Sequence, residues 1–504
     1  MFLYDDVPSS ILLKLLWLVP VLWVAYMVME RSSATRKLAG IPTVGHTGLL
    51  GSCWDAINPL AHNEKIVMDG YKKYRGGLFK ISRLNVWNVV VASPELLHDL
   101  RRAPENEMSL FFGFAEAFTS EMAQGLDPTD HKLADFHVPA ILHGITRNAD
   151  AKFPELLDEI EVFFDEICPA DGPNGEFNAR YFVGLPLCRN PEYLALAKKF
   201  TIGAVASGLV CLYLPPFLRP IIRSLFSPMT YVTRKVMKYT APIIEERMRM
   251  ERELGAAWKD ETPNDLFTWL LAEAPPQQRT PFHIAQRVLF TNMASSTSLS
   301  SSITYGIYHL AANMQFIEPL REEAEHVIGQ FGWSKASLDS MKLMESFVRE
   351  NLRYHGAGVL TMNRMIVKPG GFTFSNGVTV PEGTLVSVPE QAFHYDPAFH
   401  EDPDELNPYR FLDKENPDAM SSRISTPDES YLIFGLGRHS CPGRFYGAVL
   451  LKLIFTFILL NFDFKLENDD GKKPPRHVIL GSFFMPNTKA KIMFRRRKEA
   501  EKLS

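Results

Sequence analysis

The chain has 504 residues, of which 46% are apolar, and its formal net charge is −4. This composition is that of a globular protein able to bury a sizeable core, and the near-neutral charge gives no reason to expect nucleic acid as a partner. The five cysteines are scattered without a Cys-x-x-Cys pair, which argues against a zinc site or a disulfide framework and is typical of a reduced compartment.

An apolar segment near the N-terminus, Ile11–Met29, is long enough to cross the ~30 Å hydrocarbon layer of a membrane. Acidic residues precede it and basic residues follow it, which places the body of the protein in the cytosol by the positive-inside rule. We therefore predict a short lumenal N-terminus at residues 1–10, a transmembrane anchor at 11–29 and a basic Pro/Gly hinge at 30–50. A cleaved signal peptide is the alternative, although no small-x-small cleavage site follows the apolar run.

The next part of the chain, up to about residue 280, combines a small sheet with helices. Residues 77–82 and 85–92 are predicted strands, and a helix is predicted from Pro94 to Arg102. Helical periodicity dominates residues 132–250. Within that region, Leu212–Pro220 is an apolar loop with three prolines, which either dips into the membrane surface or connects two helices.

A long helix is predicted from Ile284 to Ala312, because this segment contains no proline and only one glycine, and its apolar residues recur at helical spacing. Its middle, Met293–Ser302, is serine-rich and has the composition of a linker. A linker lacks flanking periodicity, so we favour a helix through the core, bent where Ser and Thr hydroxyls bond the carbonyl four residues back.

A charged helix and two strands are predicted next. The three-residue spacing of Glu350 and Arg353 places a carboxylate and a guanidinium on one helix face. Alone, such a pair is usually a solvated surface contact. Residues 362–367 and 371–380 are predicted strands, with Asn376-Gly377 as a hairpin turn.

The segment that carries the chemistry is Phe434–Gly443, a loop that leads into an apolar helix at residues 445–460. Cys441 lies at this junction, where the positive end of the helix dipole favours a thiolate and Pro442 suits the first helical position. Three glycines let the backbone approach a flat group closely and direct N–H groups at sulfur: Gly435, Gly437 and Gly443.

Two further residues of the loop complete a recognisable pattern. Phe434 can shield the sulfur from water, and Arg438 offers a fixed cation to an acidic group. A thiolate held in this way is the axial ligand that donates electron density to haem iron and favours O–O cleavage. The ten-residue pattern resembles the haem-binding signature of the cytochrome P450 family. The resemblance implies haem b, with Cys441 as the iron ligand and the other residues of the pattern around the cofactor.

The resemblance also implies a fold and a catalytic helix. The fold is mainly α with a small β lobe, filling residues 51–504 as one haem-thiolate domain behind a transmembrane helix. In the family the central helix passes over the haem. The best placement puts Thr297 where the family usually has an acidic residue and Ser298 where it has an alcohol, so both are candidate catalytic residues for proton delivery.

Two more roles are implied by the same resemblance. A segment similar to the family's Pro-Glu-Arg-Phe motif supplies Arg410, which with Glu350 and Arg353 would form a structural, non-catalytic ion triad. Arg364 is a candidate partner for a haem propionate.

Phrases at residues 136–139, 145–148 and 441–445 are similar to fungal microsomal members of the family, including ent-kaurene oxidase. This similarity implies a single-pass protein of the endoplasmic reticulum membrane with its catalytic domain in the cytosol. It also implies O2 as co-substrate and NADPH electrons delivered by NADPH–cytochrome P450 reductase, with cytochrome b5 as a further partner. The expected substrate is a lipophilic small molecule, such as a terpenoid or another secondary metabolite.

Three functions are compatible with these observations. A monooxygenase that inserts one oxygen atom from O2 into a lipophilic substrate is the leading hypothesis. An isomerase or dehydratase of the same fold, working without a reductase, is the alternative that the Thr297-Ser298 pair suggests. A non-catalytic haem-binding protein is the third.

Overall fold

A computed structural model describes most of the chain. The described residues are 25, 28–29, 31–47, 51, 62–83, 87–113, 136–145, 148–167, 182–212, 228–413, 420–467, 473–480 and 482–497. They fall into two compact units. The sheet unit comprises residues 1–118, 210–221 and 359–392, and the helical unit comprises residues 119–209, 222–358 and 393–504.

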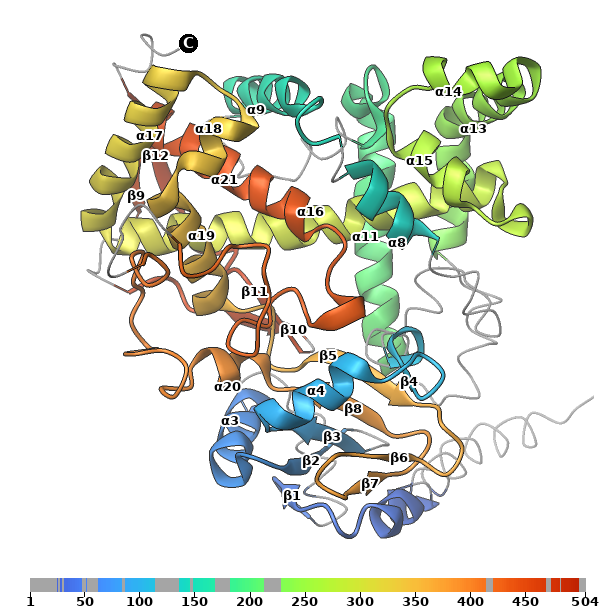
Figure 1. The fold of residues 1–504 in the computed structure, drawn as a ribbon, viewed down its shortest axis with the longest axis vertical. Helices are drawn as coiled ribbons and strands as arrows, with labels where there is room; N and C mark the ends of the chain where they lie inside the picture. The colour runs from blue at the N-terminus through green and yellow to red at the C-terminus, as the bar shows by residue number, and fades with distance from the viewer. Residues whose placement is uncertain are drawn as a thin grey trace, which may run out of the picture. The chain divides into compact units, whose positions relative to one another are not determined.

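The sheet unit is built on a six-stranded sheet in the order β1-β2-β3-β8-β5-β4. Figure 1 shows these strands side by side, with α3 packed along them. The six strands of this sheet are β1 (Thr43–Val44), β2 (Leu78–Ser82), β3 (Trp87–Val91), β4 (Met108–Ser109), β5 (Thr361–Ile366) and β8 (Leu385–Val388). The same unit contains a separate pair, β6 (Phe372–Thr373) and β7 (Thr379–Val380). Its helices are α3 (His62–Tyr74), α4 (Pro94–Arg102) and the first part of α20 (Glu390–His394).

Local sequence signals account for several of these elements. Ser93 caps α4 by accepting a hydrogen bond from the backbone N–H of Leu96, and Pro94 occupies the first turn. Every residue of β2 and β3 is buried, and the sheet continues on both sides of this antiparallel pair. The predicted strands and the helix from Pro94 to Arg102 are therefore confirmed, and β6 and β7 form the predicted hairpin.

The helical unit holds the larger core. Its longer helices are α9 (Phe153–Ile167), α11 (Pro191–Leu212), α13 (Pro228–Leu254), α16 (Pro281–Ala312), α17 (Ile317–Phe331), α19 (Lys342–His355) and α21 (Arg444–Asn461). Its shorter helices are α8 (His137–Ala140), η1 (Ile141–Ile145), η2 (Leu187–Arg189), η3 (Gly255–Ala257), α14 (Trp258–Glu261), α15 (Leu266–Glu273), η4 (Pro276–Gln278), η5 (Met314–Phe316), α18 (Lys335–Ser340) and η6 (Gly437–His439). Its strands form the pairs β9 (Phe462–Leu466) with β12 (Ile492–Arg496) and β10 (Val478–Leu480) with β11 (Phe483–Met485).

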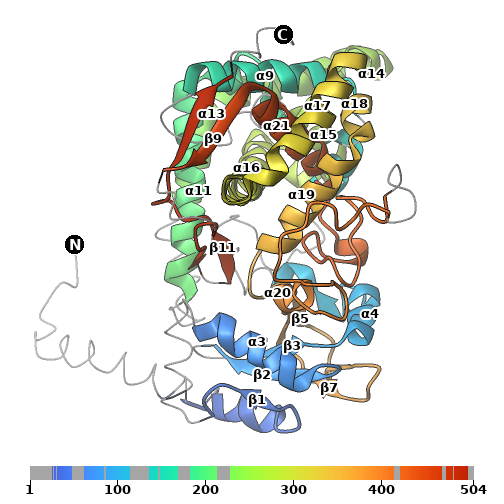
Figure 2. The ribbon, with the colours of Figure 1, turned by 90° about the vertical axis from the view of Figure 1, so that its left-hand side faces the viewer.

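The long predicted helix is present as α16, which starts three residues earlier than expected because Thr280 caps it and Pro281 fits its first turn. It runs across the helical unit in Figure 1 and is seen end-on in Figure 2. Both α19 and α21 pack against it. This arrangement places the serine-rich middle of α16 in the same unit as the cysteine loop that precedes α21.

In the part of the chain that the structure describes, α21 is the one helix long and apolar enough to cross a bilayer, and 78% of that apolar stretch is buried inside the protein. It is thus a core helix of the helical unit. The predicted anchor at residues 11–29 lies almost wholly outside the described residues, as does Leu212–Pro220 except for its first residue.

Candidate functional site

The cysteine loop folds back on itself before α21 begins. The N–H of Cys441 donates to the carbonyl of Phe434 over 2.7 Å, which closes the loop. Gly435 and Gly437 have φ of 68° and 69°, a backbone conformation that residues with a Cβ rarely adopt. The two glycines are therefore required by the turn itself, and the loop brings Phe434 and Cys441 together.

The sulfur of Cys441 faces the start of α21. The backbone N–H groups of Gly443 and Arg444 act to lower the pKa of this thiol, and the N–H of Arg444 donates to the carbonyl of Cys441 over 3.4 Å. A Cβ added at Gly443 would lie 3.9 Å from this sulfur. Cys441 as a whole residue is exposed, which leaves it accessible to a ligand. The glycine and the two N–H groups together form a cradle around the sulfur.

Two details of the loop differ from the predictions. Helix α21 begins at Arg444 with Gly443 as its N-cap, so Pro442 precedes the helix instead of occupying its first turn. Burial raises the pKa of the Cys441 thiol, and the two N–H groups and the charge of Arg444 oppose that shift only in part. The expectation that the loop by itself favours a thiolate is therefore wrong, because desolvation outweighs the helix terminus.

Phe434, the aromatic residue of the pattern, and Arg438, its cationic residue, lie in different environments. Phe434 is half-buried and contacts Tyr431 edge to face, with ring centroids 6.2 Å apart. Arg438 lies in the short turn η6 with an exposed side chain, where an acidic group can reach its guanidinium.

The middle of α16 presents an accessible stripe. Ala294, Thr297 and Ser298 are exposed, and their spacing puts them on one helix face, whereas Leu299 and Ser302 are buried. The hydroxyl of Thr297 donates to the carbonyl of Met293, and that of Ser298 to the carbonyl of Ala294, each over 2.8 Å. The structure thus leaves both candidate catalytic hydroxyls accessible, with their protons directed at the helix backbone.

Arg364 belongs to the sheet unit and is 2% exposed. One guanidinium nitrogen donates to the carbonyl of Asn363, and its Nε has no hydrogen-bond partner. Burial lowers the pKa of Arg364 to about 10, and the charge of Glu105 opposes that shift. Among the described residues, no carboxylate makes an ion pair with this guanidinium, which leaves a buried cation suited to an anionic group.

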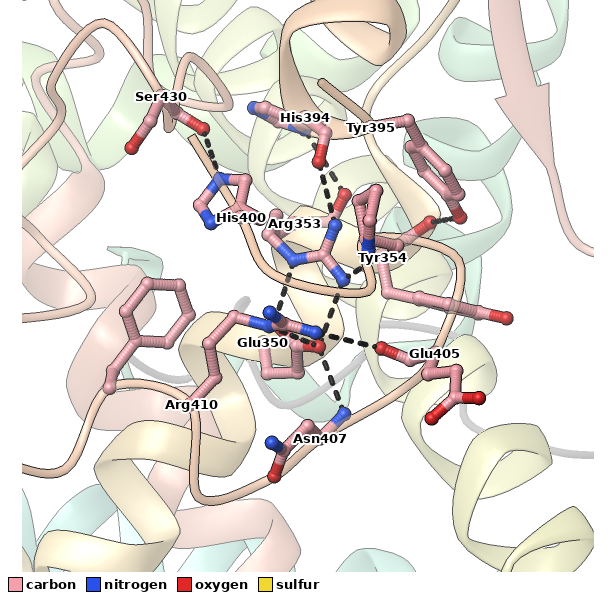
Figure 3. Close-up of polar contacts among 12 residues, drawn as sticks. Glu350, Arg353, Tyr354, His394, Tyr395, His400, Glu405, Asn407, Arg410 and Ser430 are labelled. Carbon is pink, nitrogen blue, oxygen red and sulfur yellow. Dashed lines mark hydrogen bonds and ion pairs between the residues drawn. The ribbon is translucent and has the colours of Figure 1, made fainter. Parts of the chain in front are cut away.

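The structure brings the three residues of the predicted ion triad together, as Figure 3 shows. Glu350 accepts two hydrogen bonds from Arg353, over 2.7 and 2.9 Å, and two from Nε of Arg410, each over 3.1 Å. The backbone N–H of Asn407 also donates to Glu350, over 3.0 Å. Burial alone would raise the pKa of Glu350, but these hydrogen bonds and the two positive charges hold it below its usual value.

Arg353 connects this cluster to the loop that follows α20. It donates to the carbonyls of His394 and Pro403, over 2.7 and 3.1 Å. His394 in turn accepts a hydrogen bond from the N–H of Leu432, two residues before Phe434. A continuous set of polar contacts therefore runs from α19 to the segment that enters the cysteine loop, and Figure 3 shows its part between Arg353 and His394.

The model of the family described as Cytochrome P450 matches residues 188–494, which contain the cysteine loop, the ion triad and α16. The chain belongs to the cytochrome P450 family. Family membership implies haem, O2 and an electron donor, and it makes the protein an enzyme of the monooxygenase class.

Curated cytochrome P450 relatives cover nearly the whole chain. Cytochrome P450 monooxygenase 151 of Postia placenta is 33% identical, over 91% of this chain and 94% of the relative. A cytochrome P450 monooxygenase of Ganoderma lucidum is 31% identical, over 90% of this chain and 91% of the relative. Ent-kaurene oxidase of Gibberella fujikuroi is 26% identical, over 92% of this chain and 94% of the relative.

A solved structure shows the same fold. The retinoic acid-bound cyanobacterial CYP120A1 is matched with a TM-score of 0.67 and 16% sequence identity, over 91% of this chain and 99% of that chain. The fold of a cytochrome P450, mostly helical with small sheets, is thereby confirmed.

The residues present fit the haem that the family implies. Cys441 offers a soft sulfur ligand cradled by N–H donors, the chemistry that haem iron takes in P450 enzymes. The orphaned Nε of Arg364, within the sheet unit, fits the chemistry of a propionate. The exposed guanidinium of Arg438, within the helical unit, offers a second cation.

Sequence reasoning missed the residues that support this P450 site. Arg349 lies next to Glu350 but is 1% exposed, with its guanidinium carbon 3.8 Å from the ring centroid of Tyr431 and a 2.7 Å contact to Asp428. Lys452 of α21 is also buried and pairs with Glu345 over 2.7 Å. Its position next to the Glu-x-x-Arg pair could have marked Arg349 in the sequence as a supporting residue. No neighbouring residue marked Lys452 as part of the core.

Proposed function

We propose that this P450 inserts one oxygen atom of O2 into a C–H bond of a lipophilic substrate, a terpenoid or another secondary metabolite. Two electrons from NADPH, delivered by a membrane-bound reductase, and two protons convert the other oxygen atom to water. The observation that carries the proposal is the sulfur of Cys441, which lies beside Gly443, the N-cap residue of the buried helix α21.

Cys441 would hold haem b through its sulfur. Bound haem supplies the chemistry of O2 cleavage, which a cysteine ligand favours by donating electron density. The two N–H donors stabilise charge on the sulfur, and coordination to a metal deprotonates a thiol whose pKa burial would otherwise raise. Arg438 and Arg364 act as partners of the propionates, and Phe434 limits water near the sulfur.

Ser298 is the proposed point of proton delivery, with Thr297 beside it. Each hydroxyl donates to a carbonyl of its own helix and can still accept a proton on its oxygen from a water molecule. Passing that proton on requires the hydroxyl to turn away from the carbonyl, which exposed Ser and Thr side chains can do. The structural role that we propose for Glu350, Arg353 and Arg410 is to fix α19 to the loop leading to Cys441.

The substrate class and the location rest on the relatives. Similarity to ent-kaurene oxidases at 26% identity supports a terpenoid substrate. We place the protein in the endoplasmic reticulum membrane, held by one helix at residues 11–29 with residues 51–504 in the cytosol. The proposed partners there are NADPH–cytochrome P450 reductase, cytochrome b5 and the lipid bilayer.

An isomerase or dehydratase acting without a reductase is the second candidate. The observation that favours it is the central stripe of α16, where Thr297 and Ser298 provide hydroxyls bonded to their own helix and no carboxylate. A hydroxyl is a poorer proton donor than a carboxylic acid. An already oxygenated substrate can be rearranged without the two protons that cleavage of O2 consumes.

Labelled dioxygen distinguishes the two candidates. The protein is co-expressed with a reductase in microsomes and given terpenoid and steroid substrates with and without NADPH. Label in the product only when NADPH is present supports the monooxygenase. Product formed without NADPH and without label establishes the isomerase instead.

A spectroscopic measurement tests the ligand separately. Cys441→Ser is expected to abolish the absorbance band of the reduced carbon monoxide complex that a thiolate ligand produces. Cys188→Ala is the control, because Cys188 is a buried cysteine outside the loop. An unchanged band in Cys441→Ser would remove Cys441 as the ligand.

A further inference from the structure

Two buried residues of the helical unit carry polar atoms that no described residue satisfies. Tyr305 of α16 is 3% exposed, and His355, the last residue of α19, is 8% exposed. The hydroxyl of Tyr305 and Nε2 of His355 are both shielded from solvent, and neither has a hydrogen-bond partner among the described residues. A buried polar atom without a partner costs free energy, so in folded proteins ordered water usually satisfies such atoms.

The two side chains are in direct contact. Their rings are stacked, with centroids 4.6 Å apart and planes inclined by 13°. The lone pair of an imidazole nitrogen and the O–H bond of a phenol each lie close to the plane of their own ring. Because the two planes are nearly parallel, the hydroxyl of Tyr305 is not directed at Nε2 of His355. A third group is therefore needed to join the two atoms.

The other nitrogen of His355 determines what kind of partner fits. Nδ1 lies 2.5 Å from the carbonyl of Gly356, and a carbonyl only accepts, so Nδ1 carries the ring proton. Burial lowers the pKa of His355 to about 3, so at neutral pH the ring has no second proton. Nε2 is then a bare acceptor, whereas the hydroxyl of Tyr305 is a donor. A partner for both atoms must accept one hydrogen bond and donate another.

Water meets this requirement, and ions do not. A simple anion accepts a hydrogen bond from the hydroxyl of Tyr305 but has no proton to donate to Nε2 of His355. A metal ion binds a bare nitrogen, but among the described residues no group of three His, Cys, Asp or Glu side chains is placed to hold one. A water molecule accepts and donates at once, and buried waters in proteins make about three hydrogen bonds.

The surroundings of the stacked rings are polar, because α16 and α19 are joined here by an amide side chain. Asn351 of α19 donates to the carbonyl of Ser302 over 3.0 Å, and its oxygen lies 2.8 Å from Nδ1 of His309. Ser302, Tyr305 and His309 recur at helical spacing on one face of α16. His309 also stacks on Tyr305, with ring centroids 6.1 Å apart. This face of α16 is therefore polar where α19 packs against it.

Gly306 shows how closely the neighbouring helices approach each other beside the rings. A Cβ at this position would overlap the ring of Phe455 in α21 and would lie 3.2 Å from the amide nitrogen of Asn351. Only a residue without a side chain fits there. Gly306 is the one glycine of α16, and it directly follows Tyr305. The close approach of the helices keeps the polar atoms of the stacked rings away from bulk solvent.

We propose that Tyr305 and His355 enclose an internal water site, in which ordered water accepts a hydrogen bond from the hydroxyl of Tyr305 and donates one to Nε2 of His355. The water joins α16 to α19 at a second point, beside the contact made by Asn351. Tyr305 lies seven residues, about two helical turns, after Ser298 on the same face of α16. The site therefore stabilises the half of α16 that follows the proposed proton-delivery residue, and it uses no residue assigned to haem or substrate.

A crystal structure of the full-length, haem-loaded protein tests the site directly, at a resolution that shows ordered water. Electron density for one water, or for a hydrogen-bonded pair of waters, is expected to connect the hydroxyl of Tyr305 with Nε2 of His355. In crystals of Tyr305→Phe this density should be lost, because the water no longer has its donor. Density at one atom only or at neither in the wild type, or unchanged density in the variant, would overturn the proposal.

Urea unfolding of Tyr305→Phe tests the site by the sign of the stability change. If water satisfies the hydroxyl, the variant loses a hydrogen bond, and the equilibrium constant for unfolding should rise about fivefold. A hydroxyl buried without any partner destabilises the folded protein, so its removal would instead make the protein more stable. Tyr308→Phe is the matched control and should be less stable in either case, because the buried Tyr308 donates directly to the carbonyl of Asn487 over 3.0 Å. Unchanged or greater stability of Tyr305→Phe would overturn the proposal.

A double-mutant cycle tests whether the same water contacts both residues. His355→Asn removes Nε2 and keeps an amide donor for the carbonyl of Gly356. Either single variant already breaks the bridge, so the loss of stability in Tyr305→Phe/His355→Asn should be smaller than the sum of the two single losses. Additive losses would overturn the bridge. If His355→Asn fails to fold, which loss of the reduced carbon monoxide band would reveal, the crystal structure and the sign of the Tyr305→Phe change still decide.

Discussion

Two carboxylate–guanidinium clusters with the same helical spacing occupy opposite environments. On α19, Glu350 and Arg353 are three residues apart, and both side chains are 0% exposed. On α13, Glu246 and Arg249 are also three residues apart, but their side chains are 55% and 49% exposed. Arg249 in addition contacts Glu253, just as Glu350 has a second partner in Arg410. The two clusters thus match in chemistry and differ in burial.

The difference shows that pairing alone does not decide what an ion cluster contributes. On α13 water solvates each charge, so losing a partner leaves the others hydrated. On α19 the carboxylate is removed from water, and three directed sets of hydrogen bonds replace its hydration. Removing any of those partners leaves a buried charge without compensation. The same residue spacing is therefore structurally decisive at one place and nearly neutral at the other.

The largest effect is expected for Glu350→Gln. The change leaves the guanidinium group of Arg353, which is fully buried, and that of Arg410, which is 10% exposed, without their shared carboxylate. We expect the free energy of unfolding to fall by about 3–5 kcal/mol, with loss of bound haem. Urea unfolding followed by circular dichroism measures the change, and Glu246→Gln on α13 is the matched control. Equal stability of the two variants would contradict the comparison.

A second buried pair tests whether burial has this effect elsewhere. Lys452 is 2% exposed and contacts Glu345 over 2.7 Å and Asp339 over 2.9 Å. Lys452→Met should lower the free energy of unfolding by roughly 3 kcal/mol, because Glu345 stays buried without its cation.

The double variant Lys452→Met/Glu345→Gln provides the control for this pair, since it removes the stranded charge. We expect it to recover about half of the loss, which a double-mutant cycle of urea unfolding measures. Additive losses in the double variant would show that the two side chains act independently.

Acid pH should lower the free energy of unfolding through two buried histidines, His309 and His355, before it protonates the carboxylate of Glu350. Burial lowers the pKa of His309 to about 4 and that of His355 to about 3, so both are neutral in the folded protein at pH 7. Besides burial, Asn351, Glu350 and Arg353 act on the pKa of His309. His309, His477 and the carbonyl of Gly356 act on that of His355. In the unfolded chain each histidine takes up a proton below about pH 6.5, so acid favours unfolding.

The free energy of unfolding should therefore be fully retained above pH 6.5 and fall as the pH drops towards 4, by up to about 1.4 kcal/mol per pH unit for each histidine. The contribution of Glu350, whose pKa is lowered, is lost only at more acidic pH. Urea unfolding at pH 7.5, 6 and 5 measures the slope. His355→Gln should reduce it, and an unchanged slope would exclude His355 as its source.

The smallest effect is expected for Arg249→Ala, which breaks both exposed contacts on α13 at once. Because all three side chains are well hydrated, we expect no measurable change in the thermal unfolding midpoint at physiological salt. A loss comparable with that of Glu350→Gln would show that burial is not the deciding variable.

The sequence by itself determined the family, the cysteine loop and the regular elements whose signals are local. The helix from Pro94 to Arg102 was predicted to the residue, because its cap at Ser93 and its first-turn proline are adjacent in the chain. The long helix α16 was found from its periodicity, despite a linker-like composition. Gly435 and Gly437 were singled out from the sequence for close backbone approach, and the structure adds that both have a positive φ, which residues with a Cβ rarely adopt.

Only the tertiary structure decided which charges are buried and which segments are fixed. Nothing near Glu350 in the sequence distinguishes it from Glu246, because its burial comes from loop residues such as Asn407 far along the chain. The attachment of Arg31 to the end of β2 likewise joins residues about fifty positions apart. The pKa of the Cys441 thiol followed the same rule, since desolvation by packed neighbours outweighed the local helix terminus. Burial is a property of the packed chain, so local spacing could propose these contacts but could not assign their strength.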